Sequence, residues 1–251
     1  MAKSGTNILI GRQALRELVS FAPERIEEVL IAESSSGGHR ELLNLLEEQQ
    51  IPVRTVERKK LSELAASDSH QGFLARLCPR QYLELKDLLE GGSGLVVALD
   101  AVQDPHNFGA ILRACECFGV KAVLWSKNRS CGVTPVVTKT SAGASELLSL
   151  CPVANLAEAL KRLQKAGYWV IVSDNRSDAV PINEFECPER AVIVMGSEHS
   201  GVQRRISEEA DFKVKIPMAG RLDSLNVSQA AAVLLASCCK KTEKSLAFNG
   251  N

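Results

Sequence analysis

Three stretches of the chain combine glycine with polar side chains that could hold a ligand or take part in a reaction. They read DAVQDPHNFGAILRAC from Asp100 to Cys115, VIVMGSEHSGV from Val192 to Val202, and KIPMAGRLDSLNVSQAAAVLLASCCK from Lys215 to Lys240. Each contains or directly follows an apolar run that we expect to be a strand. Because ligands of open α/β sheets bind just past the carboxyl ends of the strands, the three stretches could line one pocket.

The first stretch offers Asn107 and Arg113, which lie on either side of the start of an expected helix. Asp104-Pro105 makes a sharp turn before them, and Gly109 allows a close approach of the backbone. Arginine presents a planar fork of donors that matches a phosphate group. An ordinary turn followed by a surface arginine is the alternative interpretation.

The second stretch runs from a hydrophobic strand into a loop in which Gly196 and Gly201 flank Glu198. Two glycines let a backbone fold round a ligand, and the carboxylate could then accept a hydrogen bond from a hydroxyl group or attract a cation. A β–α turn with a solvated glutamate explains the same pattern equally well.

The third stretch places Ser224 and Asn226 at the start of an Ala-rich apolar segment that should form a buried helix. Either residue can cap that helix, so side chains and free N–H groups would converge on one spot suited to a polar ligand. Simple capping of a core helix is the alternative.

Other kinds of site are disfavoured by the sequence. The chain has neither a G-x-G-x-x-G after its first strand nor a G-x-x-x-x-G-K-[ST] motif, which argues against a dinucleotide site and a P-loop. No Ser/His/Asp order suggests hydrolysis. The eight cysteines contain no C-x-x-C pair and the four histidines are scattered, so we expect reduced thiols and no metal site. Thirty basic and thirty acidic residues cancel, so only a local basic patch could attract nucleic acid.

The elements around these stretches predict an α/β protein of two domains within 251 residues. Residues 1–78 alternate helices and short strands, residues 79–94 form a flexible linker, and residues 95–241 form a larger domain with a mainly parallel sheet. Residues 242–251 are expected to be disordered. Within the larger domain, Glu146–Leu150 is expected to be a strand, and Thr134 and Asn155 to cap helices. No apolar run is long enough to span a membrane, so we expect a cytosolic protein.

The motifs DPHNFGAILRA, VMGSEHSGV and IPMAGRLDSLNVSQAA, in this order, resemble the three motifs of the SpoU (TrmH) family of RNA ribose 2′-O-methyltransferases. The resemblance covers about Leu95 to Lys240, and the last motif is highly specific. The segments GRQALREL and SHQGFLARL in the first domain resemble the accessory domain of members that methylate a guanosine of large-subunit ribosomal RNA. That domain is similar to ribosomal protein L30e.

The resemblance implies a sheet whose C-terminal part is threaded into a trefoil knot (the SPOUT fold), a bound S-adenosylmethionine, no metal, and a homodimer. By motif position, the residues that would contact the cofactor are Gly196, Ile216 and Leu225. The residues that would form the catalytic set, in part supplied by the partner subunit, are Asn107, Arg113, Glu198, Ser224 and Asn226. His199 and Ser200 depart from the Gly and Glu of many relatives, which puts the local loop in doubt.

The expected function is therefore methyl transfer to a ribose 2′-OH of RNA, foremost a guanosine of 23S rRNA. Arg113 would grip the phosphate beside the target ribose, and either Arg113 or that phosphate would assist deprotonation of the hydroxyl group. Two alternatives stay open: a tRNA 2′-O-methyltransferase, and a catalytically silent RNA-binding protein of ribosome assembly.

The first domain would recognise the RNA. Its basic residues could contact phosphates, although a solvated charge run is an equally good interpretation. These residues are Arg54, Arg58, Lys59, Lys60 and Arg76.

Overall fold

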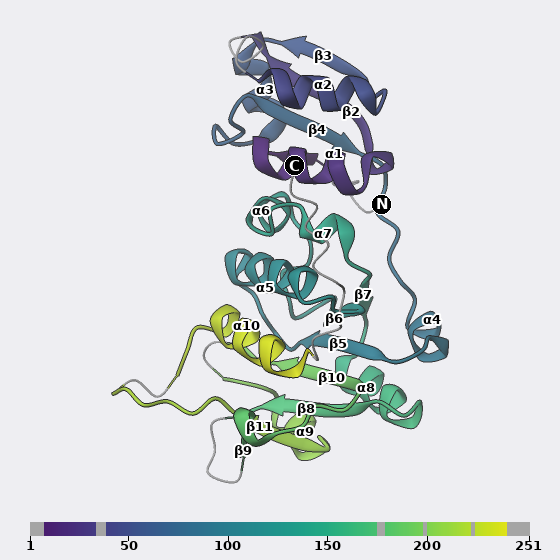
Figure 1. The fold of residues 1–251 in the computed structure, drawn as a ribbon, viewed down its shortest axis with the longest axis vertical. Helices are drawn as coiled ribbons and strands as arrows, with labels where there is room; N and C mark the ends of the chain where they lie inside the picture. The colour runs from purple at the N-terminus through teal and green to yellow at the C-terminus, as the bar shows by residue number, and fades with distance from the viewer. Residues whose placement is uncertain (1–7, 34–38, 175–178, 198–199, 222–223, 240–251) are drawn as a thin grey trace, which may run out of the picture.

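The protein is described here by a computed structural model that covers residues 8–33, 39–174, 179–197, 200–221 and 224–239. Within these ranges the chain forms two sheets stacked along the long axis of the molecule, a four-stranded sheet from the N-terminal part and a seven-stranded sheet from the rest (Figure 1). Glu198, His199 and the expected tail 242–251 lie outside the described residues.

The first sheet has the strand order β1-β4-β2-β3. Strand β4 runs antiparallel to both of its neighbours, whereas β2 and β3 are parallel. Strand β1 was not among the expected elements. The strands are β1 (Ile8–Ile10), β2 (Ile26–Ala32), β3 (Val53–Val56) and β4 (Phe73–Leu77). The helices are α1 (Arg12–Phe21), α2 (Arg40–Glu48) and α3 (Arg58–Ala65), with a 3₁₀ turn η1 (Pro23–Arg25).

The second sheet has the order β7-β6-β5-β10-β8-β11-β9, and every neighbouring pair is parallel. This confirms the expected α/β class with a mainly parallel sheet. Its strands are β5 (Gly94–Leu99), β6 (Ala122–Ser126), β7 (Leu150–Val153), β8 (Trp169–Ser173), β9 (Val180–Pro181), β10 (Arg190–Met195) and β11 (Phe212–Lys215). The helices are α4 (Leu85–Glu90), α5 (Pro105–Cys117), α6 (Pro135–Thr140), α7 (Ala144–Leu147), α8 (Leu156–Lys165), α9 (Arg204–Glu208) and α10 (Val227–Cys238), with the 3₁₀ turn η3 (Ile182–Glu184).

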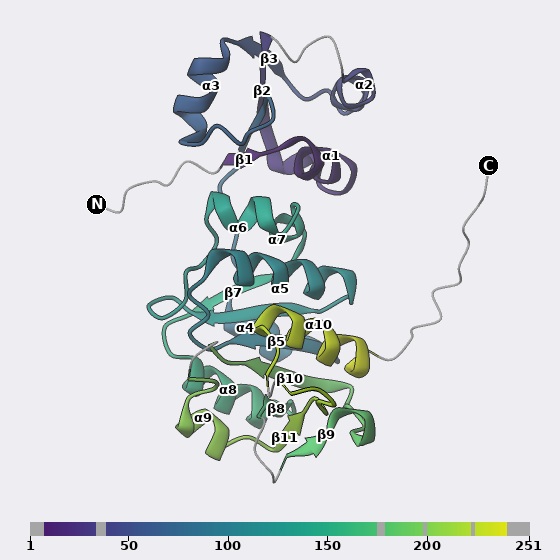
Figure 2. The same ribbon diagram turned by 90° about the vertical axis from the view of Figure 1, so that its left-hand side faces the viewer.

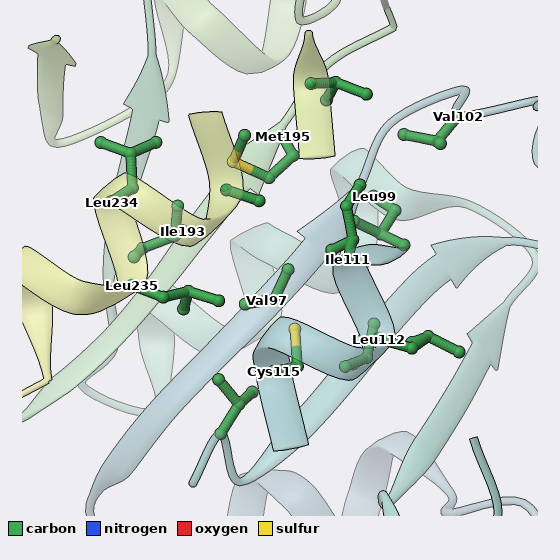
Figure 3. Close-up of a cluster of buried hydrophobic side chains, with 14 of the residues drawn as sticks. Val97, Leu99, Val102, Ile111, Leu112, Cys115, Ile193, Met195, Leu234 and Leu235 are labelled. Carbon is green, nitrogen blue, oxygen red and sulfur yellow. The ribbon is translucent and has the colours of Figure 1, made fainter. Parts of the chain in front are cut away.

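The central strands β5, β8 and β10 of the second sheet are mostly apolar because helices cover both faces. On one face, α5 and α10 pack side by side over the central strands, and Val97, Ile111 and Leu235 meet in the core that they enclose (Figure 3). On the other face, α8 packs Leu160 and Leu163 against Val96 and its neighbours. The two layers hold the carboxyl ends of all seven strands at one edge of the sheet.

The capping predictions for three helices are confirmed. Thr134 accepts a hydrogen bond from the Val137 N–H at the start of α6, and Asn155 accepts one from the Glu158 N–H at the start of α8. Asn226, rather than Ser224, caps α10.

The expected strand at Glu146–Leu150 is wrong. Residues up to Leu147 form helix α7, and the strand β7 begins only at Leu150. The reason is a tertiary contact. The Glu146 side chain is fully buried, and its carboxylate forms ion pairs with Arg25, at 2.9 Å from Nη2, and with the guanidinium of Arg80. An extended chain would have taken Glu146 away from both partners, which belong to the N-terminal part of the chain and to the connecting segment.

The two sheets are joined by contacts beyond this ion pair. Leu147 packs against the core of the first sheet, and Lys139 Nζ lies 3.3 Å from the Ser69 carbonyl oxygen. The connecting segment also touches the second sheet, because the Leu83 N–H donates to the Leu150 oxygen at 2.9 Å and Leu88 of α4 is buried. Residues 79–94 therefore include a packed helix. No described helix is long and apolar enough to cross a membrane.

His70 makes the stability of the folded protein depend on pH. The side chain is fully buried, its Nδ1 accepts from the Gly72 N–H at 2.9 Å, and its Nε2 lies 3.1 Å from Ser62 Oγ. Burial lowers the pKa of His70, Arg58 lowers it further, and Asp68 partly offsets them. The folded protein therefore takes up a proton on His70 at a lower pH than the unfolded chain, which does so below about pH 6.5.

We expect the free energy of unfolding to fall as the pH drops below about 6.5, with a slope of at most about 1.4 kcal/mol per pH unit from this residue. Above the pKa of His70 in the unfolded chain, the imidazole is neutral in both the folded and the unfolded state, so the full stability is present there. Urea titrations between pH 7.5 and 5.5 measure it. His70→Asn should flatten the slope, while replacement of the exposed His106 by Gln should leave it unchanged. Equal slopes in wild type and His70→Asn would contradict the prediction.

Candidate active site

A cavity of about 800 Å³ opens at the carboxyl edge of the second sheet. Its walls come from the segments that follow three neighbouring strands, β8, β10 and β11, and from the start of α10. Described residues that line it include Asp174 after β8, Gly196 and Ser197 after β10, Ile216 after β11, and Leu225 before α10. The structure therefore brings together two of the three stretches singled out in the sequence, and adds the end of β8.

Gly196 is the point at which the loop after β10 folds back on itself. A Cβ atom at this position would overlap the Gly201 carbonyl carbon and the Val202 nitrogen. The fold-back is held by two backbone hydrogen bonds between Ser197 and Gly201, of 3.1 and 3.0 Å. Gly201 has a φ of 64°, in the region that favours glycine. Only a glycine at 196 lets this wall of the cavity close.

Asp100 anchors the other side of the same loop. Its carboxylate is fully buried and accepts from the Gln203 N–H at 2.7 Å and from Gln203 Nε2 at 2.5 Å. The Asp100 N–H donates to the Met195 oxygen at 2.8 Å. The carboxylate thereby ties the segment leading into α9 to the end of β5. In the sequence, Asp100 stands out only as the first residue of the first stretch, with no role assigned to it.

The start of α10 supplies the floor of the cavity. Asn226 Oδ1 accepts from the Ser228 N–H at 2.8 Å and from Ser228 Oγ at 2.7 Å, so the Asn226 side chain acts as the helix cap. The two residues before it, Ser224 and Leu225, are exposed and line the cavity. Capping fixes the direction in which the chain enters α10, and thus the position of both residues.

Asn107 and Arg113 do not line this cavity. Both lie on α5, whose start is capped by Asp104 through hydrogen bonds from the N–H groups of His106 and Asn107 at 3.1 and 3.3 Å. Arg113 is exposed, and Gly109 serves close packing, because a Cβ there would lie 2.8 Å from Thr140 Cβ of α6. Within one chain, the first stretch therefore stands apart from the other two.

The sequence analysis missed several polar residues of the cavity, among them three that follow β8 or belong to α9. Asp174 follows the apolar strand β8, and Ser207 and Arg204 belong to α9. Ser207 Oγ donates to Asp174 Oδ2 at 3.4 Å. The signal for Asp174 was present, because a carboxylate directly after a buried parallel strand lies at the ligand-binding edge. No comparable pattern marked α9, whose position depends on the long-range contact with Asp100.

Three cysteines of the part of the chain that forms the second sheet are poor nucleophiles. Burial raises the pKa of Cys115, and it raises those of Cys131 and Cys151 to about 11 in each case. These thiols stay protonated at neutral pH, when only a thiolate reacts readily. The described residues also contain no group of three or more His, Cys, Asp or Glu side chains placed to hold a metal ion.

Comparison with known proteins adds two matches along the chain. Residues 94–236 match the SpoU rRNA Methylase family, and residues 8–83 match the family described as RNA 2′-O ribose methyltransferase substrate binding. The boundary between the matches falls in the segment that connects the two sheets.

Full-length relatives and solved structures agree with these matches. The chain is 37% identical over 233 residues to the 23S rRNA (guanosine-2′-O-)-methyltransferase RlmB of Pseudomonas putida, covering 90% of this chain and 93% of the relative. The SpoU methyltransferase AviRb of Streptomyces viridochromogenes superposes with a TM-score of 0.75 at 20% identity, over 94% of this chain and 89% of AviRb. An AdoMet-bound rRNA methyltransferase of Sinorhizobium meliloti gives a TM-score of 0.73 at 21% identity, over 92% and 85% of the two chains. These two structures support the fold.

The fold-back at Gly196 yields a test of the cavity wall. Gly196→Ala should displace the loop after β10 and lower the free energy of unfolding by about 1–3 kcal/mol, because the added methyl group meets backbone atoms. Hydrogen exchange should show faster exchange of the Ser197 and Gly201 amides. Gly220→Ala is the matched control, since a Cβ there meets open space. Unchanged protection in Gly196→Ala would show that the loop does not close as described.

Proposed function

The chain belongs to the SpoU rRNA methylase family, and from that premise we propose that it transfers a methyl group from S-adenosylmethionine to a ribose 2′-OH of RNA. The observation that carries the proposal is the cavity at the carboxyl edge of the sheet, where the three residues matched to cofactor binding converge. They come from three different segments, after β10, after β11 and before α10: Gly196, Ile216 and Leu225.

The proposed substrate is a guanosine of 23S rRNA. The identity to RlmB extends over 90% of this chain, so it includes the N-terminal part as well as the catalytic part. The match of residues 8–83 to a substrate-binding family supports a role of the first sheet in holding the RNA. Such an enzyme would act in the cytoplasm. The proposal is tested against two alternatives: an enzyme that methylates transfer RNA, and a protein that binds RNA without catalysis.

The cavity fits the proposed cofactor in size and in lining. A volume of about 800 Å³ lies within the range of small-molecule sites. Apolar side chains of Ile216, Leu225 and Val227 can contact a purine ring, while Asp174 and Ser197 offer polar partners for hydroxyl or amino groups. Gly196, Ile216 and Leu225 would hold the cofactor largely through backbone groups. When bound, S-adenosylmethionine supplies an electrophilic methyl group on a sulfonium centre.

The protein side chains then have to position a poor nucleophile. Arg113 is proposed to bind the phosphate beside the target ribose and so orient the 2′-OH, and Asn107 and Ser224 to hold the nucleotide. Glu198 remains a candidate of the same set by its motif position. The 2′-OH proton would leave either to that phosphate or with the help of Arg113, whose high pKa makes it a weak base. Asn226 would act through its cap, which fixes Ser224 and Leu225.

We propose that the active form is a homodimer in which one subunit supplies Arg113 and Asn107 to the cavity of the other. The support is that neither residue lines the cavity of its own chain, although both are accessible on α5. The guanidinium that does line the cavity, that of Arg204, is paired with Glu208, so the proposed catalytic arginine would have to come from a second copy.

The domain division and the knot are also proposals. Residues 1–78 are proposed to be an L30e-like RNA-binding domain, residues 79–94 a linker, and residues 95–241 the catalytic domain. A trefoil knot is supported by the strand order, since β10 lies between β5 and β8 although it follows both in the chain. The segment after β11 would then have to be threaded before α10 could pack beside α5.

The function is tested by incubating the purified protein with methyl-labelled S-adenosylmethionine and separate pools of unmodified rRNA and tRNA. We expect label in 23S rRNA only, on a ribose 2′-oxygen of a guanosine, mapped by nuclease digestion and mass spectrometry. Label in tRNA alone would replace the proposed substrate. Cofactor binding without label in either pool would favour the catalytically silent alternative.

The role of Arg113 is tested by mixing two inactive variants. Arg113→Ala and Ser224→Ala should each abolish methyl transfer, and Arg113→Ala should leave calorimetric binding of S-adenosylhomocysteine unchanged. Mixed dimers regain one intact site, so a random mixture should recover about one quarter of wild-type activity. Arg205→Ala, an exposed arginine that does not line the cavity, is the control. No recovery in the mixture would place Arg113 in its own subunit's site.

A further inference from the structure

A second cavity, of about 760 Å³, opens at the same edge of the large sheet but beyond β6 and β7. It is lined by Trp125 and Lys127 at the end of β6, by Asn155 and Arg162 of the α8 region, and by Tyr82 of the connecting segment. None of the residues assigned to the proposed cofactor or to the catalytic set lines it. Nothing in the family matches gives this cavity a role.

Hydrogen bonds connect a wall of the second cavity to the segment at residues 99–102, which precedes the first motif. The loop after β6 forms one of its walls, and the Cys131 N–H in that loop donates to the Val102 oxygen at 3.2 Å. Ser130 Oγ lies 3.5 Å from the Leu99 oxygen. Both acceptors belong to the strand and loop that lead to Asp104 and Asn107. One wall of the second cavity is therefore in direct contact with the segment that leads to the start of α5.

An exposed aromatic ring stands at the mouth of the second cavity. Tyr82 is 45% exposed and packs edge-on against Trp125, with 6.0 Å between ring centroids and an interplanar angle of 71°. Trp125 is itself fixed by the buried Phe108, at 5.6 Å and 89°. The Tyr82 ring is thus supported on one side and open on the other, an arrangement on which a flat ring can stack.

Positively charged side chains line the same cavity or belong to the loop that forms its wall. Lys127 and Arg162 line the cavity, and Arg129 is exposed on the loop after β6. These three make no ion pair with any residue that the structure describes, in contrast to Arg54 and Arg76 of the first domain, which both pair with Glu28.

Two carboxylates also line the cavity. One of them, Glu84, lies 3.1 Å from Lys86 Nζ, which leaves Glu158 as the unpaired acid among the described lining residues. The free charge is therefore positive. The start of α8, capped by Asn155, adds the positive end of a helix dipole to the same wall.

We propose that this second cavity binds an unpaired nucleotide of the RNA that flanks the methylated one, with its base on Tyr82 and its phosphates on Lys127, Arg129 and Arg162. The proposal rests on the proposed function. Its occupant is single-stranded RNA because an open aromatic ring combined with free cations is the combination that binds such chains without a fixed sequence. The position fits as well: Tyr82 lies in the segment that connects the part matched to substrate binding with the catalytic part, where RNA held by both could reach it.

The test compares full-length variants on the RNA that the wild type methylates. Tyr82→Ala and Arg162→Gln should each raise the KM for RNA about tenfold, as expected for a lost stacking or phosphate contact, with kcat at saturating RNA and S-adenosylhomocysteine affinity unchanged. Tyr82→Phe should behave as wild type because the ring remains. Arg162→Gln should also lower the slope of log affinity against log salt by about 0.7.

Matched controls lie on the same elements or carry the same chemistry elsewhere. Lys165→Gln removes a charge from α8 outside the cavity, and Trp169→Ala removes an exposed aromatic ring from the opposite edge of the sheet. Both should keep wild-type KM. Photocrosslinking of wild-type protein to RNA containing 4-thiouridine should label Tyr82 or its neighbours, which avoids any dependence on variant folding.

The outcomes separate the two proposals. If the wild type methylates RNA but Tyr82 and Arg162 variants keep its KM and no crosslink maps to the second cavity, the inference is wrong and the function stands. If the wild type neither binds nor methylates RNA, the function fails and the inference fails with it. If Arg162→Gln and Lys165→Gln raise the KM equally while Tyr82→Ala leaves it unchanged, the effect comes from the overall positive charge of the surface. That result would overturn the specific site.

Discussion

The buried carboxylate of Asp100 is the contact on which the arrangement of the site depends. It sits at the end of the central strand β5 and accepts two hydrogen bonds from Gln203, more than a hundred residues later in the chain. A carboxylate buried without partners would be costly, so the pair specifies where the segment before α9 must lie. That position in turn shapes the fold-back at Gly196, and with it the cavity wall. The Asp100 side chain thus helps to fix the position of the loop that forms one wall of the cavity.

A second buried carboxylate fixes the relation between the two halves of the molecule. Glu146 is reached by Arg25 from the first domain and by Arg80 from the connecting segment. Removing one partner of such a group leaves an uncompensated charge, which typically costs several kcal/mol, so the three residues strongly favour a single orientation. With Leu147 inserted in the core of the first sheet, this orientation is held by packing as well as by charge. The two halves are therefore held in one relative orientation.

Much of this fold could be predicted from the sequence because it is encoded locally. Strand β5 is a continuous apolar run, and Thr134, Asn155 and Asn226 cap helices by bonds to N–H groups two or three residues away. The prediction was wrong at Glu146, where a distant ion pair decides the local conformation. For the same reason the Asp100 contact and the lining residues of α9 could not be found: no local pattern records a partner a hundred residues away.

The separation of Asn107 and Arg113 from the cavity is the most informative difference between the sequence motifs and the single chain. The motifs place these residues with Ser224 and Asn226, yet α5 and α10 lie side by side with their polar residues on different surfaces. A motif reports that residues serve one reaction, whereas it does not say that they belong to one molecule. The exposed position of Arg113 is unexplained by packing, since it contributes nothing to the core beneath α5. It would be explained by the role proposed for Arg113, which is to bind an RNA phosphate at the cavity of a second copy of the chain.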